Sequence, residues 1–467
     1  MIQVSDFSFQ YSKHTPLILD EINLTIETGE WVVITGKSGC GKSTFARALA
    51  GFLFHPLTGI ANGSIESNGI SIKTIPLHEW SREVYLVQQN PKNQFCTLSV
   101  QDEIAFGLEN RLEPPEVISE RLAFALDAVQ GAHLETRNIL ELSGGEQQKI
   151  AIATAIALSP KLLIMDEPSS NLDPDSTRRL YQVLLHLQDT LDLSVVIFEH
   201  NTALLDSLTT NHFMLEAGKL FKTALPAWDI FFQKQKESEF VSNNVIGKEI
   251  IQLENYQVFR EEKPILDVQD FSLHEKQIIS LSGPNGSGKT SFLMSLMGFL
   301  PSRADIKSIF DSEISESPSN KIRQQIGFAF QNPDDQLFCE SVQEEIEYGP
   351  NNFYSKANLF QRWMQHLIEV FGFGETREKH PYILSYGQKG RLNLTAILSY
   401  KPKLLLLDEI FIGQDPANIE FLLDFIYQYM QGESAGVIIV NHHPEVMTQF
   451  ATAHYEIKDG KMRAANE

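Results

Sequence analysis

Two glycine-rich stretches of the sequence could bind phosphate groups. GKSGCGKS and GPNGSGKT share one pattern, in which two glycines with four residues between them precede a lysine and a hydroxyl residue. Such glycines let the backbone curve so that its N–H groups point at phosphate oxygens, and the following helix adds its positive N-terminal end. The lysine would reach the β- and γ-phosphates and the hydroxyl would ligate Mg²⁺. The expected nucleotide-binding residues are Gly36, Lys37, Ser38, Gly39, Cys40, Gly41, Lys42, Ser43 and Thr44, then Gly283, Pro284, Asn285, Gly286, Ser287, Gly288, Lys289, Thr290 and Ser291.

A carboxylate pair follows four apolar residues in two places. Asp166 and Glu167 end LLIMDE, and Asp408 and Glu409 end LLLLDE. Such a run suits a buried parallel strand, whose carboxyl end is the edge at which ligands bind in open α/β sheets. Alone, the pattern more often ends a strand in solvated charge. Downstream of a phosphate loop, it predicts aspartates that hold Mg²⁺ and glutamates that accept the proton of the attacking water.

A histidine ends a further apolar run in each region. His200 follows VVIFE and His442 follows VIIVN. A lone histidine is usually structural, but these two lie at the same distance, 34 residues, from Asp166 and Asp408. The equal spacing predicts a polar contact to the γ-phosphate in each case.

These motifs recur because the chain is internally duplicated. Five segments occur twice in the same order, and 23 residues separate Ser143 from Asp166 as well as Ser385 from Asp408. The offset of roughly 245 residues is too long for a solenoid repeat, so each copy is a whole domain. The predicted organisation is a first domain at 1–223, a linker at 224–248 and a second domain at 249–467.

Each copy must supply strands that end at the motifs and helices that follow them. The segments at 2–11 and 251–260 alternate loosely between apolar and polar residues and are typical of strands. ISERLAFALDAV at 118–129 has a helical pattern. We therefore predict an α/β fold with a mainly parallel core sheet, an antiparallel β region and an inserted helical subdomain in each half.

The composition bears on three questions: whether the protein binds nucleic acid, whether its cysteines are reduced, and whether it spans a membrane. The 467 residues include 38 Lys and Arg against 60 Asp and Glu, a net charge of −22, which argues against a nucleic-acid partner. Cys40, Cys96 and Cys339 show no disulfide or metal-ligand pattern, so reduced thiols are expected. No run approaches the roughly 18 apolar residues of a membrane span. Any membrane role is therefore expected to use another subunit.

The segments ELSGGEQQK and ILSYGQKGR complete a resemblance to the ATP-binding-cassette (ABC) family of P-loop ATPases, over nearly the whole chain. Within them, LSGGE at 142–146 and LSYGQ at 384–388 match the family's signature motif. The resemblance implies an intramolecular pseudo-dimer whose halves close head to tail around two ATP molecules. One implied site joins the 36–44 loop to Ser385, Gly387 and Gln388. The other joins the 283–291 loop to Ser143, Gly144, Gly145 and Glu146.

The same resemblance assigns further residues. Gln89 and Gln331 match the family's glutamine loop, which senses Mg²⁺ and the membrane partner, and Tyr11 matches the aromatic residue that stacks on adenine. Asp173 and Asp415 match the D-loop. The expected Mg²⁺ ligands are therefore Ser43, Gln89, Asp166, Thr290, Gln331 and Asp408.

QNPKNQF and QNPDDQLF, each followed by VQDEIAFG or VQEEIEYG, resemble energy-coupling-factor and cobalt-type importer ATPases. This resemblance implies a transmembrane coupling protein, a small substrate-binding membrane subunit and a place on the cytoplasmic face of the membrane. The cargo would be a vitamin, a vitamin precursor or a metal ion. The residues at 94–95 and 336–338 either line the groove for coupling helices or, for Phe95 and Phe338, belong to the core.

Departures from the family pattern predict unequal sites. Tyr386 replaces a signature glycine, Arg260 stands opposite Tyr11, and Ile410 replaces the proline after the catalytic glutamate. Both halves keep Lys, Asp, Glu and His, so both are expected to hydrolyse ATP.

Two alternatives stay open. A tandem sugar-importer ATPase typically has a degenerate second phosphate loop, whereas GPNGSGKT is intact. A soluble tandem cassette protein of the ribosome usually has a long charged linker and basic surfaces, which a net charge of −22 opposes.

Overall fold

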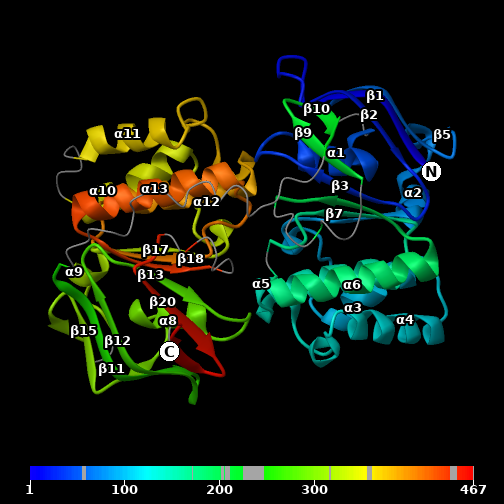
Figure 1. Ribbon diagram of the computed structural model, residues 1–467. Helices are drawn as coiled ribbons and strands as arrows, with labels where there is room; N and C mark the ends of the chain where they lie inside the picture. The colour runs from blue at the N-terminus through cyan, green and yellow to red at the C-terminus, as the bar shows by residue number, and fades with distance from the viewer. Residues whose placement is uncertain are drawn as a thin grey trace. The chain divides into compact units, whose positions relative to one another are not determined.

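The computed structural model divides the chain into two units, Met1–Gln233 and Lys234–Glu467 (Figure 1). The described residues are 1–54, 59–170, 172–200, 205, 211–223, 247–314, 317–354, 360–441, 447 and 450–465. Of the predicted linker at 224–248, residues 224–246 lie outside this set.

The core of the first unit is a six-stranded sheet in the order β10-β9-β3-β8-β7-β6. All neighbours from β9 to β6 are parallel, and β10 is antiparallel to β9. All residues of β3, β7 and β8 are buried, as expected for parallel strands covered on both faces. The strands are β3 (Trp31–Thr35), β6 (Val84–Val87), β7 (Leu162–Asp166), β8 (Ser194–Phe198), β9 (His212–Glu216) and β10 (Lys219–Lys222).

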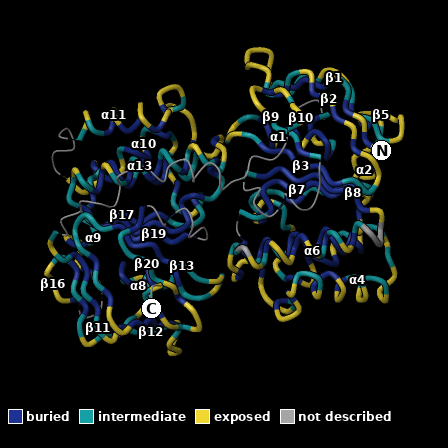
Figure 2. Tube along the Cα trace, viewed as in Figure 1, coloured by how far each residue is buried: buried dark blue, intermediate teal, exposed yellow. Residues whose placement is uncertain are grey.

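Alternate residues of each central strand enter different hydrophobic clusters. Trp31 and Val33 pack into one cluster, and Val32 and Ile34 pack into the other. This follows from the two-residue period of a strand. The sheet thus lies between two buried layers, which appear as dark blue segments in Figure 2.

Different elements cover the two faces of the first unit's sheet. On one face, α1 (Lys42–Leu49) packs with an antiparallel sheet in the order β2-β1-β4-β5. On the other face lie α3, α4, α5 and α6 (Figure 1), which confirms the predicted helical subdomain. The remaining bounds are β1 (Ile2–Gln10), β2 (Leu19–Ile26), β4 (Ile60–Ser67), β5 (Ile70–Ser71), α2 (Leu77–Glu83), α3 (Val100–Asn110), α4 (Pro115–Ala128), α5 (Gly144–Leu158) and α6 (Pro174–Leu191).

The second unit repeats this strand order, but as one continuous sheet, β16-β15-β11-β12-β21-β20-β13-β19-β18-β17, with β14 beside β11. The antiparallel and parallel parts join where Asp267 of β12 pairs with Lys461 of β21. The strands are β11 (Glu249–Arg260), β12 (Lys263–His274), β13 (Ile278–Ser282), β14 (Ser302–Arg303), β15 (Ile306–Ile309), β16 (Ser312–Glu313), β17 (Ile326–Ala329), β18 (Leu404–Asp408), β19 (Gly436–Val440), β20 (Ala453–Lys458) and β21 (Lys461–Ala464).

The helices of the second unit occupy matching places in the chain order. They are α8 (Lys289–Leu296), α9 (Asn320–Arg323), α10 (Val342–Phe353), α11 (Gln361–Val370), α12 (Tyr386–Leu398) and α13 (Pro416–Glu433). Among the helices that the structure describes, none is both long enough and apolar enough to cross a bilayer. The three cysteines form no disulfide. The predicted tandem α/β fold is confirmed.

Candidate active site

Each glycine-rich loop connects a buried central strand to a helix. The first runs from β3 to α1 and the second from β13 to α8. Gly39 and Gly286 have φ of 79° and 77°, and Gly41 and Gly288, which precede the helices, have φ of 109° and 107°. Glycine adopts this left-handed region without a steric penalty, so both loops curve in the same way. The two loops therefore have the geometry predicted for phosphate cradles.

Gly283 tests how tightly the second loop is packed. Its φ is 142°, and a Cβ atom there would overlap the carbonyl oxygen of Ile457 on β20. Gly283→Ala should therefore lower the free energy of unfolding by about 1–3 kcal/mol, measured by urea denaturation. Gly432→Ala is the matched control, because a Cβ atom at that glycine meets no atom within 4 Å. Equal stability of the two variants would contradict the steric argument.

In the first unit, the predicted catalytic residues contact one another. Lys42 Nζ donates to the carbonyl oxygens of Gly36 at 2.9 Å and Lys37 at 3.3 Å. His200 Nε2 lies 2.9 Å from Lys42 Nζ and 3.0 Å from Glu167 Oε1. Gln89 Nε2 donates to Glu167 Oε2 at 2.5 Å. Four separate chain segments therefore meet at Glu167.

The charge state of Glu167 is set by these neighbours. Burial raises the pKa of its carboxyl group, but His200 and Lys42 outweigh burial and bring the pKa below its usual value. Glu167 is therefore ionised at neutral pH, as a general base requires.

Asp166 and Asp408, the residues before the two glutamates, have carboxyl groups whose pKa is raised. Burial and the adjacent glutamate raise the pKa of Asp166 to about 6 and that of Asp408 to about 7. Asp166 Oδ1 and both carboxylate oxygens of Asp408 are buried without a hydrogen-bond partner. Since buried oxygens normally have partners, these atoms fit a site that a cation completes.

The donor set around these aspartates is typical of Mg²⁺ bound together with a nucleotide. Ser43 lies near Asp166 and Thr290 near Asp408, where their hydroxyls oppose the rise in pKa. Among the described residues, no group of three or more His, Cys, Asp or Glu side chains could hold a metal ion. Mg²⁺ usually keeps only one or two protein carboxylates and takes its other ligands from water and phosphate. The residues present therefore fit Mg²⁺.

The second unit repeats part of the same arrangement. Lys289 Nζ donates to the carbonyl oxygens of Gly283 at 2.8 Å and Pro284 at 2.9 Å. Gln331 Nε2 donates to Glu409 Oε2 at 2.6 Å. The predicted His442 lies outside the described residues. The contact between the glutamine and the glutamate is thus common to both units.

Both glutamates have an unusual backbone. Glu167 has φ of 52° and Glu409 has φ of 51°, in the left-handed region. Their N–H groups still donate to the neighbouring strand, at Phe198 and Val440. A non-glycine residue in this region costs about 1–3 kcal/mol, and such residues cluster at functional sites. The conformation therefore supports the catalytic role that the sequence predicts for both residues.

The two signature segments begin helices. Ser143 is the N-cap of α5 and forms a capping box with Glu146. Ser385 is the N-cap of α12 and forms a capping box with Gln388. Gly144, Gly145 and Gly387 lie in the first turns of these helices, where N–H groups favour an anion. The serine and the glutamate or glutamine of each signature segment therefore have a structural role as helix caps, in addition to their predicted contact with ATP.

The structure also places the predicted adenine-stacking residue and the predicted D-loop aspartates. Tyr11 is exposed and its hydroxyl lies 3.2 Å from Thr44 Oγ1, so its ring stands beside the first phosphate loop. Asp173 and Asp415 are the N-caps of α6 and α13. In the second unit, Arg260 is exposed at the end of β11.

Sequence reasoning missed a contact between the second signature and the glutamine loop. The Tyr386 hydroxyl donates to the carbonyl oxygen of Gln331 at 3.2 Å. One turn later, Lys389 Nζ donates to Asp334 Oδ1 at 2.7 Å. The tyrosine that departs from the family pattern was the available signal.

Sequence reasoning also missed Glu199, which immediately precedes His200. This side chain is buried and its carboxylate accepts hydrogen bonds from the Ser169 hydroxyl at 2.7 Å and the His200 N–H at 2.9 Å. Burial and the nearby Glu167 raise its pKa. The signal was the mismatch between Glu199 and Asn441 at matched positions of the repeat.

The residues next to the glutamine loops divide between core and surface. Phe95 is partly buried against the core of the first unit, and Leu337 is buried. Phe338 is 64% exposed, and its ring packs edge-on against Tyr348 with the centroids 4.7 Å apart. Phe95 thus packs with the core, as one of the two predicted alternatives states, whereas Phe338 is a surface residue.

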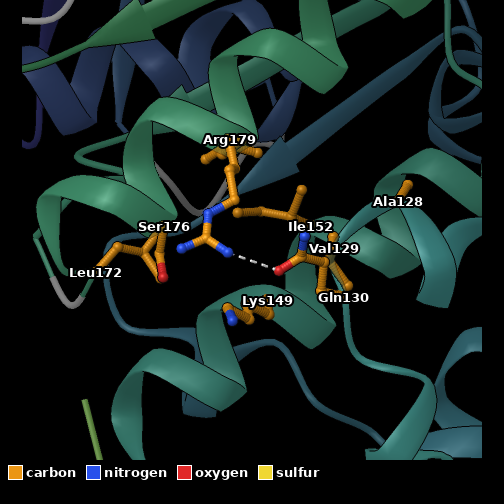
Figure 3. A pocket seen from close by; sticks show the side chains of 9 residues that line it. Ala128, Val129, Gln130, Lys149, Ile152, Leu172, Ser176 and Arg179 are labelled. Carbon is orange, nitrogen blue, oxygen red and sulfur yellow. Dashed lines mark hydrogen bonds between the residues drawn. The ribbon is translucent and has the colours of Figure 1, made fainter. Parts of the chain in front are cut away.

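A small pocket in the first unit contains none of the predicted site residues. Figure 3 shows Arg179 pointing across it to Gln130, with a hydrogen bond of 2.9 Å. Phe421 occupies the position of Arg179 in the repeat, and its ring packs against Phe371. The second unit therefore places aromatic rings where the first has this opening. The lining is Ala128, Val129, Gln130, Lys149, Ile152, Leu172, Ser176, Arg179 and Leu180.

Comparison with known proteins gives matches over nearly the whole chain. The family described as "ABC transporter" matches residues 19–170 and 266–411. A Bacillus subtilis protein, "Putative HMP/thiamine import ATP-binding protein YkoD", is 30% identical over 98% of this chain and 90% of its own length. A "Putative ABC transporter ATP-binding protein" of Methanosarcina acetivorans is 29% identical over 99% of this chain and 84% of its own length.

A solved structure has the same tandem fold. "Model of ribosome-bound archaeal Pelota and ABCE1" contains a chain with a TM-score of 0.69 and 20% identity, covering 98% of this chain and 78% of that one. At this identity the likeness concerns the fold.

Proposed function

The chain belongs to the ABC transporter family as a tandem-cassette ATPase, and on that premise we propose that it is the ATP-hydrolysing subunit of a membrane importer of the energy-coupling-factor type. It would bind two ATP molecules between its halves, at the cytoplasmic face of the membrane. The 30% identity to a protein named as an HMP/thiamine import ATP-binding protein supports import of a vitamin or a vitamin precursor. A metal ion is the other candidate cargo, and it rests on the sequence resemblance to cobalt-type importer ATPases.

The observation that carries this proposal is the duplicated cluster at the carboxyl ends of the parallel strands. Each unit has a lysine at the start of a helix, a buried aspartate, and a glutamate held by the amide of a glutamine. A chain with one intact and one decayed copy would suit the sugar-importer alternative better.

In the proposed reaction, Glu167 accepts the proton of the attacking water, and Gln89 and His200 keep its carboxylate oriented. Lys42 and the loop N–H groups bind phosphate oxygens, and Ser143 and Ser385 would contact the nucleotide from the opposite half. Bound Mg²⁺, held by Asp166 and Ser43 in one site and by Asp408 and Thr290 in the other, would offset phosphate charge. Glu409 and Gln331 have the matching roles in the second site.

Exposed aromatic residues support a membrane partner. Phe106 of α3 is 44% exposed and Tyr348 of α10, its counterpart in the repeat, is 47% exposed. Phe338 lies against Tyr348. Apolar side chains exposed at matching places on both units suit a surface that another subunit covers.

Affinity purification of the tagged chain from detergent-solubilised membranes should recover small hydrophobic membrane subunits. Phe338→Ser together with Tyr348→Ser should reduce that recovery at least about tenfold, because the apolar contact is lost. Leu112→Ser is the matched control, because Leu112 is a 90% exposed apolar residue in the turn that follows α3 of the other unit. Recovery of ribosomes instead of membrane subunits would contradict the import role and support the translation-associated alternative.

A further inference from the structure

A largely buried polar cluster adjoins the segments of Glu167 and His200 in the first unit. It consists of Ser169, Tyr181 and Glu199, and we refer to it as the Glu199 cluster. Glu199 is 3% exposed and Tyr181 is 2% exposed. Buried polar residues are expensive unless they make hydrogen bonds, so this cluster needs an explanation.

Glu199 connects the two chain segments that carry the predicted catalytic residues. Its Oε1 accepts from the N–H of His200 at 2.9 Å. Its Oε2 accepts from the hydroxyl of Ser169 at 2.7 Å and from the Ser169 N–H at 3.4 Å. Ser169 lies two residues after Glu167 in the segment that follows β7, and His200 lies in the segment that follows the adjacent strand β8. One carboxylate therefore joins the segments that follow the two strands.

The second unit has different residues at all three positions. A constant offset of 242 residues relates the two acid pairs and the N-caps Asp173 and Asp415. The same offset pairs Ser169 with Phe411, Tyr181 with Leu423 and Glu199 with Asn441. Phe411 and Leu423 are buried and have no polar side-chain atom. The second unit thus cannot form the bond between Ser169 and Glu199.

From these contacts we infer that Glu199 is a positioning residue for the ATPase site of the first half, and that the two sites differ because only one has it. This inference rests on the proposed function. By holding Ser169 and the His200 backbone, Glu199 keeps Glu167 Oε1 and His200 Nε2 at their separation of 3.0 Å. A small displacement of a catalytic group can lower a rate by as much as about 100-fold.

The test isolates the first site. In a Glu409→Gln chain, whose second base is removed, Glu199→Gln and Ser169→Ala are made singly and together. Phosphate release is measured against ATP concentration, and ATP affinity is measured with a fluorescent ATP analogue. Each single variant should lower kcat about tenfold and change KM less than about twofold. The double variant should be no slower than the slower single variant, because both break the same bond.

Glu103→Gln in the same chain is the matched control. Glu103 is also buried and accepts hydrogen bonds from the N–H groups of Cys96 and Thr97, but it lies outside the Glu199 cluster. Its kcat should stay within about twofold of the Glu409→Gln chain, as for a change away from the catalytic groups.

Several results would overturn the inference. They are an unchanged kcat in Glu199→Gln and Ser169→Ala, a rise in KM as large as the fall in kcat, and additive losses in the double variant. Should Glu199→Gln fail to fold, Ser169→Ala decides by itself. If Glu409→Gln by itself abolishes turnover, the Glu199 and Ser169 variants are compared in the chain that retains Glu409. Absence of turnover in the intact chain would instead reject the proposed function.

Discussion

Replacing Glu167 and Glu409 together by glutamine should lower ATP hydrolysis by about 10²- to 10⁴-fold while ATP binding persists. The amide of glutamine has nearly the shape of the carboxylate but cannot accept the proton of the attacking water. The lysines, the aspartates and both phosphate loops are left unchanged. Phosphate release gives the rate, and equilibrium titration with a fluorescent ATP analogue gives the affinity.

A matched control separates this effect from any loss of buried charge. Glu103 and Glu345 are also buried, and each accepts hydrogen bonds from backbone N–H groups of its own unit. Glu103→Gln combined with Glu345→Gln should leave the rate within about twofold of the native value. Undiminished hydrolysis in the chain without Glu167 and Glu409 would remove both residues from the catalytic role.

Lys42→Ala and Lys289→Ala should each weaken ATP binding about 10- to 100-fold at the site that contains the substitution. Each ammonium group is buried and donates to two carbonyl oxygens of its own glycine-rich loop, so it is the cation best placed for phosphate oxygens bound there. Titration of the native chain should reveal two sites, and each single variant should retain one at the original affinity.

Lys161→Ala is the control for loss of a positive charge, because Lys161 is an exposed surface residue paired with Glu83. It should bind two ATP molecules as the native chain does. Two undisturbed sites in Lys42→Ala or in Lys289→Ala would mean that the corresponding loop does not bind nucleotide.

Much of the fold could be predicted because the decisive signals are local. LLIM and LLLL are short, apolar and bounded by turn residues, and they form β7 and β18 with every residue buried. The phosphate loops depend on glycines at fixed offsets, and those glycines have the left-handed φ values that such loops need. Chain order and spacing then identified the repeated domain.

The contacts that refine the site could not be predicted in the same way. Glu199 and Ser169 are 30 residues apart, and Tyr386 and Gln331 are 55 residues apart. Their hydrogen bonds exist only because the strands and helices are packed, and no periodic pattern encodes them. What the sequence did contain were mismatches between the copies, Glu199 against Asn441 and Tyr386 against Gly144. Such mismatches in a duplicated chain are therefore good places to look for specialised contacts.

The left-handed backbone of Glu167 and Glu409 bears on the evolution of thermal stability in this protein. Glycine or asparagine would relax each of these positions and make the folded state more stable, but would remove the carboxylate. Selection for heat resistance and selection for turnover thus act in opposite directions at two residues. Any stabilised descendant of this chain must gain its stability elsewhere, because these two positions are closed to improvement.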